Sequence, residues 1–434
     1  MTTPQRPGTT SRPWLSRAVK QGFGEQAPHP MYTPEFAKDP HAAYIQWRSA
    51  HGSLAPVELA PGVPATLVLG HSTALQILND ETHFPADPRA WQPSVPSGCP
   101  ILPMMEWRPN ALRSSGYAHQ RYRAANVAAI ETVDQHKMRA VLEQMAVPLI
   151  NEFCTGGGAA PRTMASAELL GQYIYPLVYQ MLAFVLGFDA DTNEQVGLGM
   201  AMMFDAAADA EAGGALMVTA LDEHIQRKRA QPGDDITSHL IASSDLSTEE
   251  LIHQLVTLQG AGSEPLAHLI SGTLMLMLTD ERFAGDLLGG SLSTRDALDE
   301  VLFTNPPLAN YCITYPPQPT LIDKVWLPAN QPVVISMAAS NTDPAIHSDR
   351  FDQFGNRAHL AWGAGPHRCP AQHLGYQVAT DAIDNLLDAL PELQLAVSVE
   401  ELTWRPGPFH RALESLPVRF PASAPLPLPL SFPE

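Results

Sequence analysis

The sequence has few cysteines and few cationic residues, and both shortages exclude classes of protein. Four cysteines in 434 residues are too few and too scattered for a disulfide scaffold: Cys99, Cys154, Cys312 and Cys369. Lys and Arg number 26 against 45 for Asp and Glu, which gives a formal charge of −19. Because nucleic acids and anionic membranes attract clustered positive charge, we expect neither as a partner.

Long apolar runs are also missing. The first 20 residues are basic but have no apolar core of the kind that a secretory signal needs. The longest apolar stretch near the middle of the chain, residues 269–280, is too short to span a membrane and contains polar residues. We therefore expect a cytoplasmic protein with reduced thiols and no membrane partner.

What is present is a chain rich enough in apolar residues, 45%, to bury a sizeable core. Apolar residues recur at helical spacing over eight segments: 71–79, 119–130, 133–153, 164–187, 215–229, 247–279, 294–304 and 370–389. Strand-like segments are short: Ala65–Leu69, Val325–Pro328 and Gln331–Met337. The pattern predicts a mainly α protein with a small β subdomain.

Proline marks the expected boundaries of the domain. Residues 1–30 are polar and proline-rich and predict a mobile N-terminal arm, and residues 421–434 predict a proline-rich C-terminal tail. Residues 31–420 are then a single domain. Its longest expected helix, 247–279, opens with Ser247 and Glu250 at capping-box spacing and would be about 50 Å long.

One loop carries the residues best suited to chemistry. Trp362–Ala371 contains two glycines, then His367, Arg368 and Cys369, directly before a helical pattern. Positive charge and a helix N-terminus both favour a thiolate, which is a nucleophile or a metal ligand. Two alternatives stay open, an inert buried cysteine and a zinc site, although His367 with Cys369 lacks a second ligand pair.

The loop resembles the haem-binding loop of cytochromes P450, Phe-Gly-x-Gly-x-His/Arg-x-Cys-x-Gly, with Trp362 and Ala371 as departures. Other segments are similar to the family in order and spacing: His119–Arg123, residues 234–240 and 246–252, Gln259–Glu264, Asn341–Pro344, Arg350–Asp352 and Leu416–Val418. The resemblance covers roughly residues 30–420. It implies the cytochrome P450 fold, with haem between a long central helix and the Cys-loop helix.

The resemblance also assigns roles to residues. Cys369 would be the thiolate ligand of the iron of haem b, and backbone amides of the loop around Gly363 and Gly365 would bond to its sulfur. Cationic groups that would pair with the haem propionates are His119, Arg123 and His367. Ala261 and Gly262 would line the oxygen-binding groove. Electrons would come from NAD(P)H through a ferredoxin and a ferredoxin reductase.

Three further departures from the family matter more. The Glu-x-x-Arg motif becomes Glu300–Phe303, so the Arg of its internal ion pair is lost and Glu300 needs another partner. The acid-alcohol pair becomes Glu264–Pro265, and proline has no hydroxyl and favours a kink. The Arg expected after the Pro-Pro segment has no counterpart in residues 308–314, where Tyr311 or a water would stand in.

These features lead to a functional hypothesis. The resemblance implies a haem-thiolate oxidoreductase that tailors a natural product, with Glu264 and Pro265 at the catalytic positions. His268, one helical turn after Glu264, is a third catalytic candidate because of this spacing. A peptide-derived substrate is our preferred interpretation, because its polar group would replace the threonine hydroxyl that the acid-alcohol pair has lost. Hydroxylation or oxidative decarboxylation would then be possible. Two alternatives remain: a haem-binding recruiting or partner protein without turnover, and a helical interaction scaffold without haem.

Overall fold

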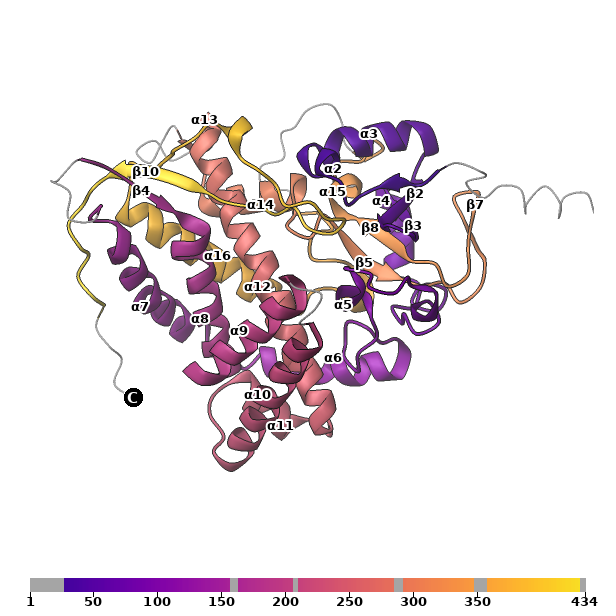
Figure 1. Cartoon of the computed structure of the whole chain (residues 1–434), viewed down its shortest axis with the longest axis horizontal. Coiled ribbons are helices and arrows are strands. Elements are labelled where there is room, and N and C mark those ends of the chain that lie inside the picture. The colour runs from indigo at the N-terminus through magenta and orange to yellow at the C-terminus, as the bar shows by residue number, and fades with distance from the viewer. Residues whose placement is uncertain (1–26, 157–162, 206–209, 285–291, 347–356, 430–434) are drawn as a thin grey trace, which may run out of the picture.

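The computed structural model describes residues 27–156, 163–205, 210–284, 292–346 and 357–429. Most helices gather on one side of the molecule, and the largest sheet lies on the other with α2, α3 and α4 (Figure 1). The helices are α2 (Pro34–Lys38), α3 (Pro40–His51), α4 (His71–Leu78), α5 (Leu102–Met105), α6 (Gly116–Ile130), α7 (Gln135–Phe153), α8 (Tyr175–Leu186), α9 (Ala190–Asp205), α10 (Ala210–Ala230), α11 (Ile236–Ser243), α12 (Thr248–Thr279), α13 (Glu281–Ala284), α14 (Thr294–Thr304), α15 (Met337–Asn341) and α16 (Gln372–Ala389).

In the part of the chain that the structure describes, the strands form three small sheets. They are β1 (His29–Pro30), β2 (Leu54–Ala60), β3 (Val63–Val68), β4 (Met164–Glu168), β5 (Asn310–Thr314), β6 (Thr320–Ile322), β7 (Val325–Leu327), β8 (Val333–Ser336), β9 (Gln394–Leu395) and β10 (Pro417–Pro421). The largest sheet has the order β1-β2-β3-β8-β5, in which β8 runs parallel to β3 and antiparallel to β5. The other two are β4-β10-β9 and the β6–β7 pair. One apolar core fills the helical side of the molecule, and another packs against the largest sheet.

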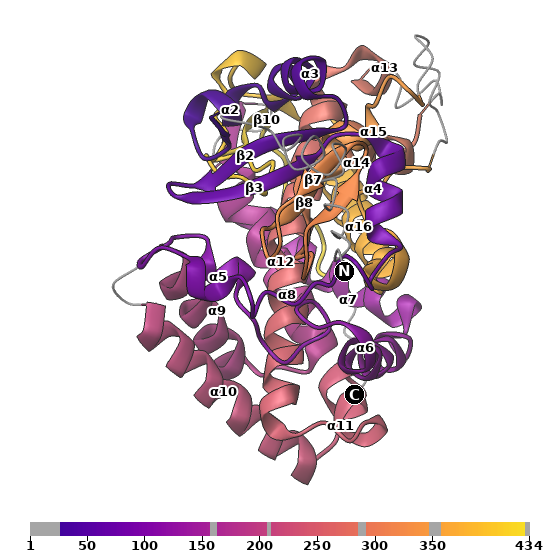
Figure 2. The same cartoon turned by 90° about the vertical axis from the view of Figure 1, so that its right-hand side faces the viewer.

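Helix α12 organises the molecule. Its capping box is formed as expected: the Ser247 side chain accepts the Glu250 N–H, and the Glu250 carboxylate accepts the Ser247 N–H. The helix continues through Pro265 for 32 residues, which is about 48 Å at 1.5 Å per residue. In Figure 2 it spans most of the height of the molecule, with α9 and α10 on one side of its lower half and α6 on the other. No helix among the described residues is long and apolar enough to cross a membrane.

The predicted mainly α architecture is confirmed, but the expected helix over 164–187 is wrong at its start. Residues 164–168 form β4, which pairs antiparallel with β10, and their burial alternates from residue to residue. Small side chains hid this period-two pattern, and the pairing partner lies about 250 residues away.

Residues near both ends of the described chain are hydrogen-bonded to the rest of the fold. His29–Pro30 already pair with β2, so ordered structure starts before residue 31. The tail is bonded to α7 and its C-terminal end, since Ser423 N–H donates to the Cys154 carbonyl and Leu426 N–H donates to Asn151 Oδ1. Residues 1–26, 430–434 and the expected Arg350–Asp352 motif lie outside the described residues. The division into arm, domain and tail stays a prediction.

Candidate functional site

The cysteine loop is held in a tight turn before α16. Gly363 and Gly365 have φ of +69° and +66°, the left-handed region that glycine tolerates best. A Cβ at Gly365 would lie 2.1 Å from the carbonyl oxygen of Leu78 at the end of α4, so the close approach requires glycine. The loop closes through a hydrogen bond of 2.8 Å from Cys369 N–H to the Trp362 carbonyl.

Donors and cations surround the Cys369 sulfur. Burial raises the pKa of the thiol, while a backbone N–H of Ala371 and the positive charges of Arg123 and Arg368 act in the opposite direction. These groups would stabilise a thiolate once a metal replaces the proton.

Two histidines lie together beside the loop. The His119 and His367 rings stack with centroids 3.9 Å apart, and His119 is only 2% exposed. Neither ring nitrogen of His119 has a hydrogen-bond partner in the described part of the chain. The nearest carboxylate, from Glu81, lies 3.6 Å from His119 Nδ1 and 3.9 Å from His367 Nε2. Glu81, His119 and His367 also have the spacing of a metal-binding group, but Cys369 is not part of it.

Arg123 lies on the same face of α6 as His119, four residues further on. Burial lowers the pKa of Arg123, and the Cys369 sulfur is the group that favours its charged form. The pKa of His367 falls to about 3, first through burial and then through the charges of His119, Arg123 and Arg113. The histidines are therefore neutral at pH 7 and face a region of positive potential.

This donor set fits a haem. The group needs one soft axial ligand and cationic or N–H donors for its two carboxylates. Cys369 supplies a thiol, His119 supplies buried ring nitrogens without a partner, and Arg123 supplies a half-buried cation. Cys369, His119, Arg123 and His367 thus lie together as the sequence predicts, and their individual roles remain proposals.

The two predicted groove residues face different surroundings. Ala261 is exposed in the middle of α12, so this face of the helix is open. Gly262 packs against α8 instead, where a Cβ would lie 2.8 Å from Leu182 Cδ2. Helix packing explains this glycine without a ligand.

Glu264 belongs to a polar cluster that the sequence shows only in part. Its Oε2 lies 3.3 Å from His268 Nε2 and accepts a hydrogen bond from Arg405. His268 Nε2 also lies 3.2 Å from the Tyr175 hydroxyl and 2.8 Å from Arg405 Nη2. Sequence reasoning missed Arg405 and Tyr175, which lie 137 and 93 residues from His268 and belong to no motif.

Opposing effects set the charges in this cluster. Burial alone would raise the pKa of Glu264, but His268 and Arg405 lower it to about 2. For His268, burial and Arg405 outweigh Glu264 and lower the pKa. At neutral pH the cluster therefore holds an ionised carboxylate, a neutral imidazole and a guanidinium.

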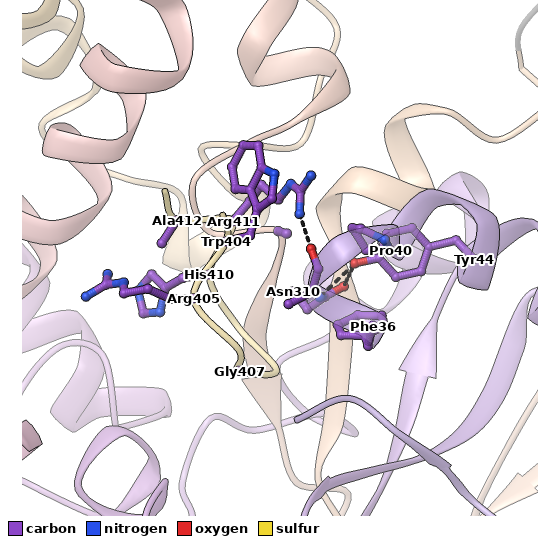
Figure 3. Close-up of a pocket in the computed structure, with 12 residues that line it drawn as sticks. Phe36, Pro40, Tyr44, Asn310, Trp404, Arg405, Gly407, His410, Arg411 and Ala412 are labelled. Atoms are coloured by element: carbon purple, nitrogen blue, oxygen red, sulfur yellow. Dashed lines mark hydrogen bonds between the residues drawn. The ribbon is translucent and has the colours of Figure 1, made fainter. Parts of the chain in front are cut away.

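Arg405 comes from the segment 404–412, which also borders a small cavity of about 10 Å³ (Figure 3). In that view Arg405 and His410 point to one side of the segment, while Phe36 and Tyr44 lie on the other. The volume is about that of one water molecule, so this cavity does not hold a substrate.

With Phe303 in place of the motif's Arg, Glu300 has another partner, as expected. Glu300 pairs instead with Arg282, at 2.6 Å, near the surface. One residue earlier, Asp299 is 3% exposed and accepts hydrogen bonds from the Tyr376 hydroxyl at 2.6 Å and from Arg357 Nε at 2.9 Å. Asp299 thus links α14 to α16 and to the segment that leads into the cysteine loop.

Phe303 fills the position of the family's Arg. It is 3% exposed, and its ring meets the His359 ring edge-on with centroids 6.4 Å apart. Tyr311, named as a stand-in for the other missing Arg, accepts a hydrogen bond of 2.5 Å from Arg113 Nη2. Both departures are therefore accommodated by neighbouring side chains.

Comparison with known proteins places these features in a family. No family model matches the chain. The 2-hydroxy-5-methyl-1-naphthoate 7-hydroxylase of Streptomyces carzinostaticus is 27% identical over 90% of this chain and 97% of that protein. The cytochrome P450 monooxygenase PikC of Streptomyces venezuelae is 28% identical over 89% of this chain and 92% of the PikC chain.

Solved structures agree. CYP154C4 from Streptomyces sp. ATCC 11861, solved with testerone bound, superposes with a TM-score of 0.82 at 26% identity. The match covers 92% of this chain and 99% of that one. CYP154A1 from Streptomyces coelicolor A3(2) gives a TM-score of 0.76, also at 26% identity, over 90% and 99%. The chain has the cytochrome P450 fold and is similar along most of its length to bacterial P450 monooxygenases.

Proposed function

We propose that this P450 oxidises a natural product with Cys369 as its axial thiolate ligand. The observation that carries the proposal is the position of Cys369, in a glycine-containing loop directly before α16. His119, Arg123 and His367 lie beside it. The relatives support the class of reaction, since they include a naphthoate hydroxylase, PikC and a pentalenolactone synthase. When bound, haem supplies the chemistry of oxygen activation.

The chain's own residues would move the protons. Pro265 has no hydroxyl, so the family's usual donor at this position is lost. We assign proton handling to Glu264 and His268, because neutral His268 can take a proton at Nε2, 3.3 Å from Glu264 Oε2. The Tyr175 hydroxyl and Arg405 fix the orientation of that imidazole.

A relay built this way is incomplete without the substrate. With a pKa of about 2, Glu264 holds no proton to donate at neutral pH. A polar hydrogen on the substrate would complete the path, and an amide N–H provides one. The partly exposed Arg405, with 43% of its side chain accessible, would attract such a group. These points support a peptide-derived substrate and either hydroxylation or oxidative decarboxylation.

Bacterial P450s of this kind take electrons from ferredoxin-type partners and act on small molecules. For this chain we propose a ferredoxin and an NAD(P)H-dependent ferredoxin reductase.

The coupling of NAD(P)H consumption to product formation tests the relay. The native substrate is sought first. The gene for this protein is deleted, and the products of the neighbouring biosynthetic genes are screened for a change in mass. We expect good coupling with that compound and poor coupling with simple surrogates. Glu264→Gln should lower turnover of the native substrate by about 10²-fold or more, without loss of haem. Pro265→Thr should improve coupling with surrogates more than with the native substrate.

Glu249→Gln is the matched control, because Glu249 lies exposed in the first turn of the same helix and should leave turnover unchanged. Equal coupling for surrogate and native substrate in the unmodified protein would contradict substrate-assisted proton delivery. A reduced, haem-loaded protein that forms no product from any neighbouring metabolite would instead favour the partner protein without turnover.

A further inference from the structure

A buried arginine near the cysteine loop has no acidic partner among the described residues. Arg113 is 4% exposed, and its Nη2 donates to the Tyr311 hydroxyl at 2.5 Å and to the Met104 carbonyl. The charges and dipoles that act on it come from Tyr311, Tyr315 and Cys312, and no carboxylate of the described residues is among them. A buried cation without a counterion is costly, so this one calls for an anion.

The turn that carries Arg113 lies between α12 and the cysteine loop. On the α12 side, Asn110 Nδ2 donates to Thr257 Oγ1 at 2.7 Å, and Gln254 Nε2 donates to the Pro109 carbonyl at 2.9 Å. On the other side, the backbone of Ala111 is hydrogen-bonded to the His367 ring. This is the region in which the fold is expected to hold haem.

Tyr311 brings Arg113 to the position where the family's arginine is missing. Residues 308–314 lack that arginine, and Tyr311 lies within them on β5. The next residue, Cys312, lies against the cysteine loop, with its Sγ 3.5 Å from the Cβ position of Gly363. A cation from a different part of the chain therefore occupies the neighbourhood of the lost one.

We propose that Arg113 binds a haem carboxylate and replaces the arginine absent from residues 308–314, with Tyr311 as its positioning residue. The inference rests on the proposed function in one respect, that the bound group is haem. It extends the predicted cationic set of His119, Arg123 and His367 by a residue that no motif indicates.

Haem loss from the holoprotein to apomyoglobin tests the proposal. The same variants are measured with haem and with haem dimethyl ester, whose carboxylates are neutral. We expect Arg113→Gln to speed loss of haem at least about tenfold, which corresponds to about 1.4 kcal/mol. It should leave loss of the ester unchanged. Arg113→Lys should fall between Gln and the unmodified protein, because it keeps the charge.

Arg48→Gln is the matched control. Arg48 also donates to two main-chain carbonyls, of Leu69 and Ala339, but lies between α3 and the sheet. Its replacement should affect haem and ester equally. An Arg113→Gln effect that is equal for haem and ester, or absent, overturns the inference and assigns Arg113 a purely structural role. An unmodified protein that retains no haem contradicts the proposed function as well.

Discussion

Asp299→Asn should destabilise the protein more than Glu300→Gln, although the family's motif places the structural carboxylate at Glu300. Asp299 is 3% exposed and accepts the buried Tyr376 hydroxyl at 2.6 Å. Asparagine keeps a carbonyl acceptor but loses the charge. A hydrogen bond to a charged group contributes about 1.5–3 kcal/mol against about 1 for a neutral one, so the expected cost is about 0.5–2 kcal/mol. Arg357 is exposed, and we assign it no share of this energy.

The control pair is weak by the same reasoning. Glu300 and Arg282 keep 26% and 43% of their side chains accessible, and exposed ion pairs contribute about 0–1 kcal/mol. For a chain of 434 residues, about 0.5–2 kcal/mol corresponds to a Tm lower by about 0.5–2 °C. Thermal unfolding of the holoproteins, followed by circular dichroism at one scan rate, measures both variants. A larger loss of Tm for Glu300→Gln than for Asp299→Asn would refute the assignment of Asp299.

Four further variants probe the site. Phe303→Arg should lower the Tm, because it buries a charge beside His359 in surroundings adapted to an aromatic ring. A raised Tm with normal haem content would show that the family's arginine pocket is intact. Gly365→Ala should lower haem content and stability through its backbone clash, whereas Gly262→Ala should cost little because it meets only the flexible end of a leucine. The pKa of Glu264 is about 2 in the folded protein, against an ordinary value of 4.5. The ionised carboxylate therefore stabilises the fold above about pH 4.5, by at most about 3 kcal/mol. This stabilisation is lost as the pH falls toward 2. Acid unfolding should therefore be less steep for Glu264→Gln.

Local signals in the sequence predicted much of this fold. The capping box at Ser247, the helical period of residues 248–279 and the glycines around Cys369 act within a few residues, so each can be recognised without knowledge of tertiary contacts. The order and spacing of these motifs along the chain are what make the family recognisable from the sequence alone.

The missed features all depend on contacts between distant segments. Asp299 is an ordinary helical aspartate until Tyr376, 77 residues later, reaches it. Arg113 lies in a loop without periodicity, and only its contact with Tyr311, 198 residues away, shows where its charge lies. Pairings of this kind leave no pattern in a single sequence, because each partner is chosen by the packing of the whole chain.

The carbon monoxide difference spectrum of Cys369→Ala tests the central claim most directly. Cys312→Ala is the matched control, because Cys312 is a second half-buried thiol that lies against the same loop. We expect the unmodified protein and Cys312→Ala to show the difference band that gives the family its name, and Cys369→Ala to lose it. A Cys369→Ala protein that keeps this band unchanged would contradict the assignment of Cys369 as the haem ligand.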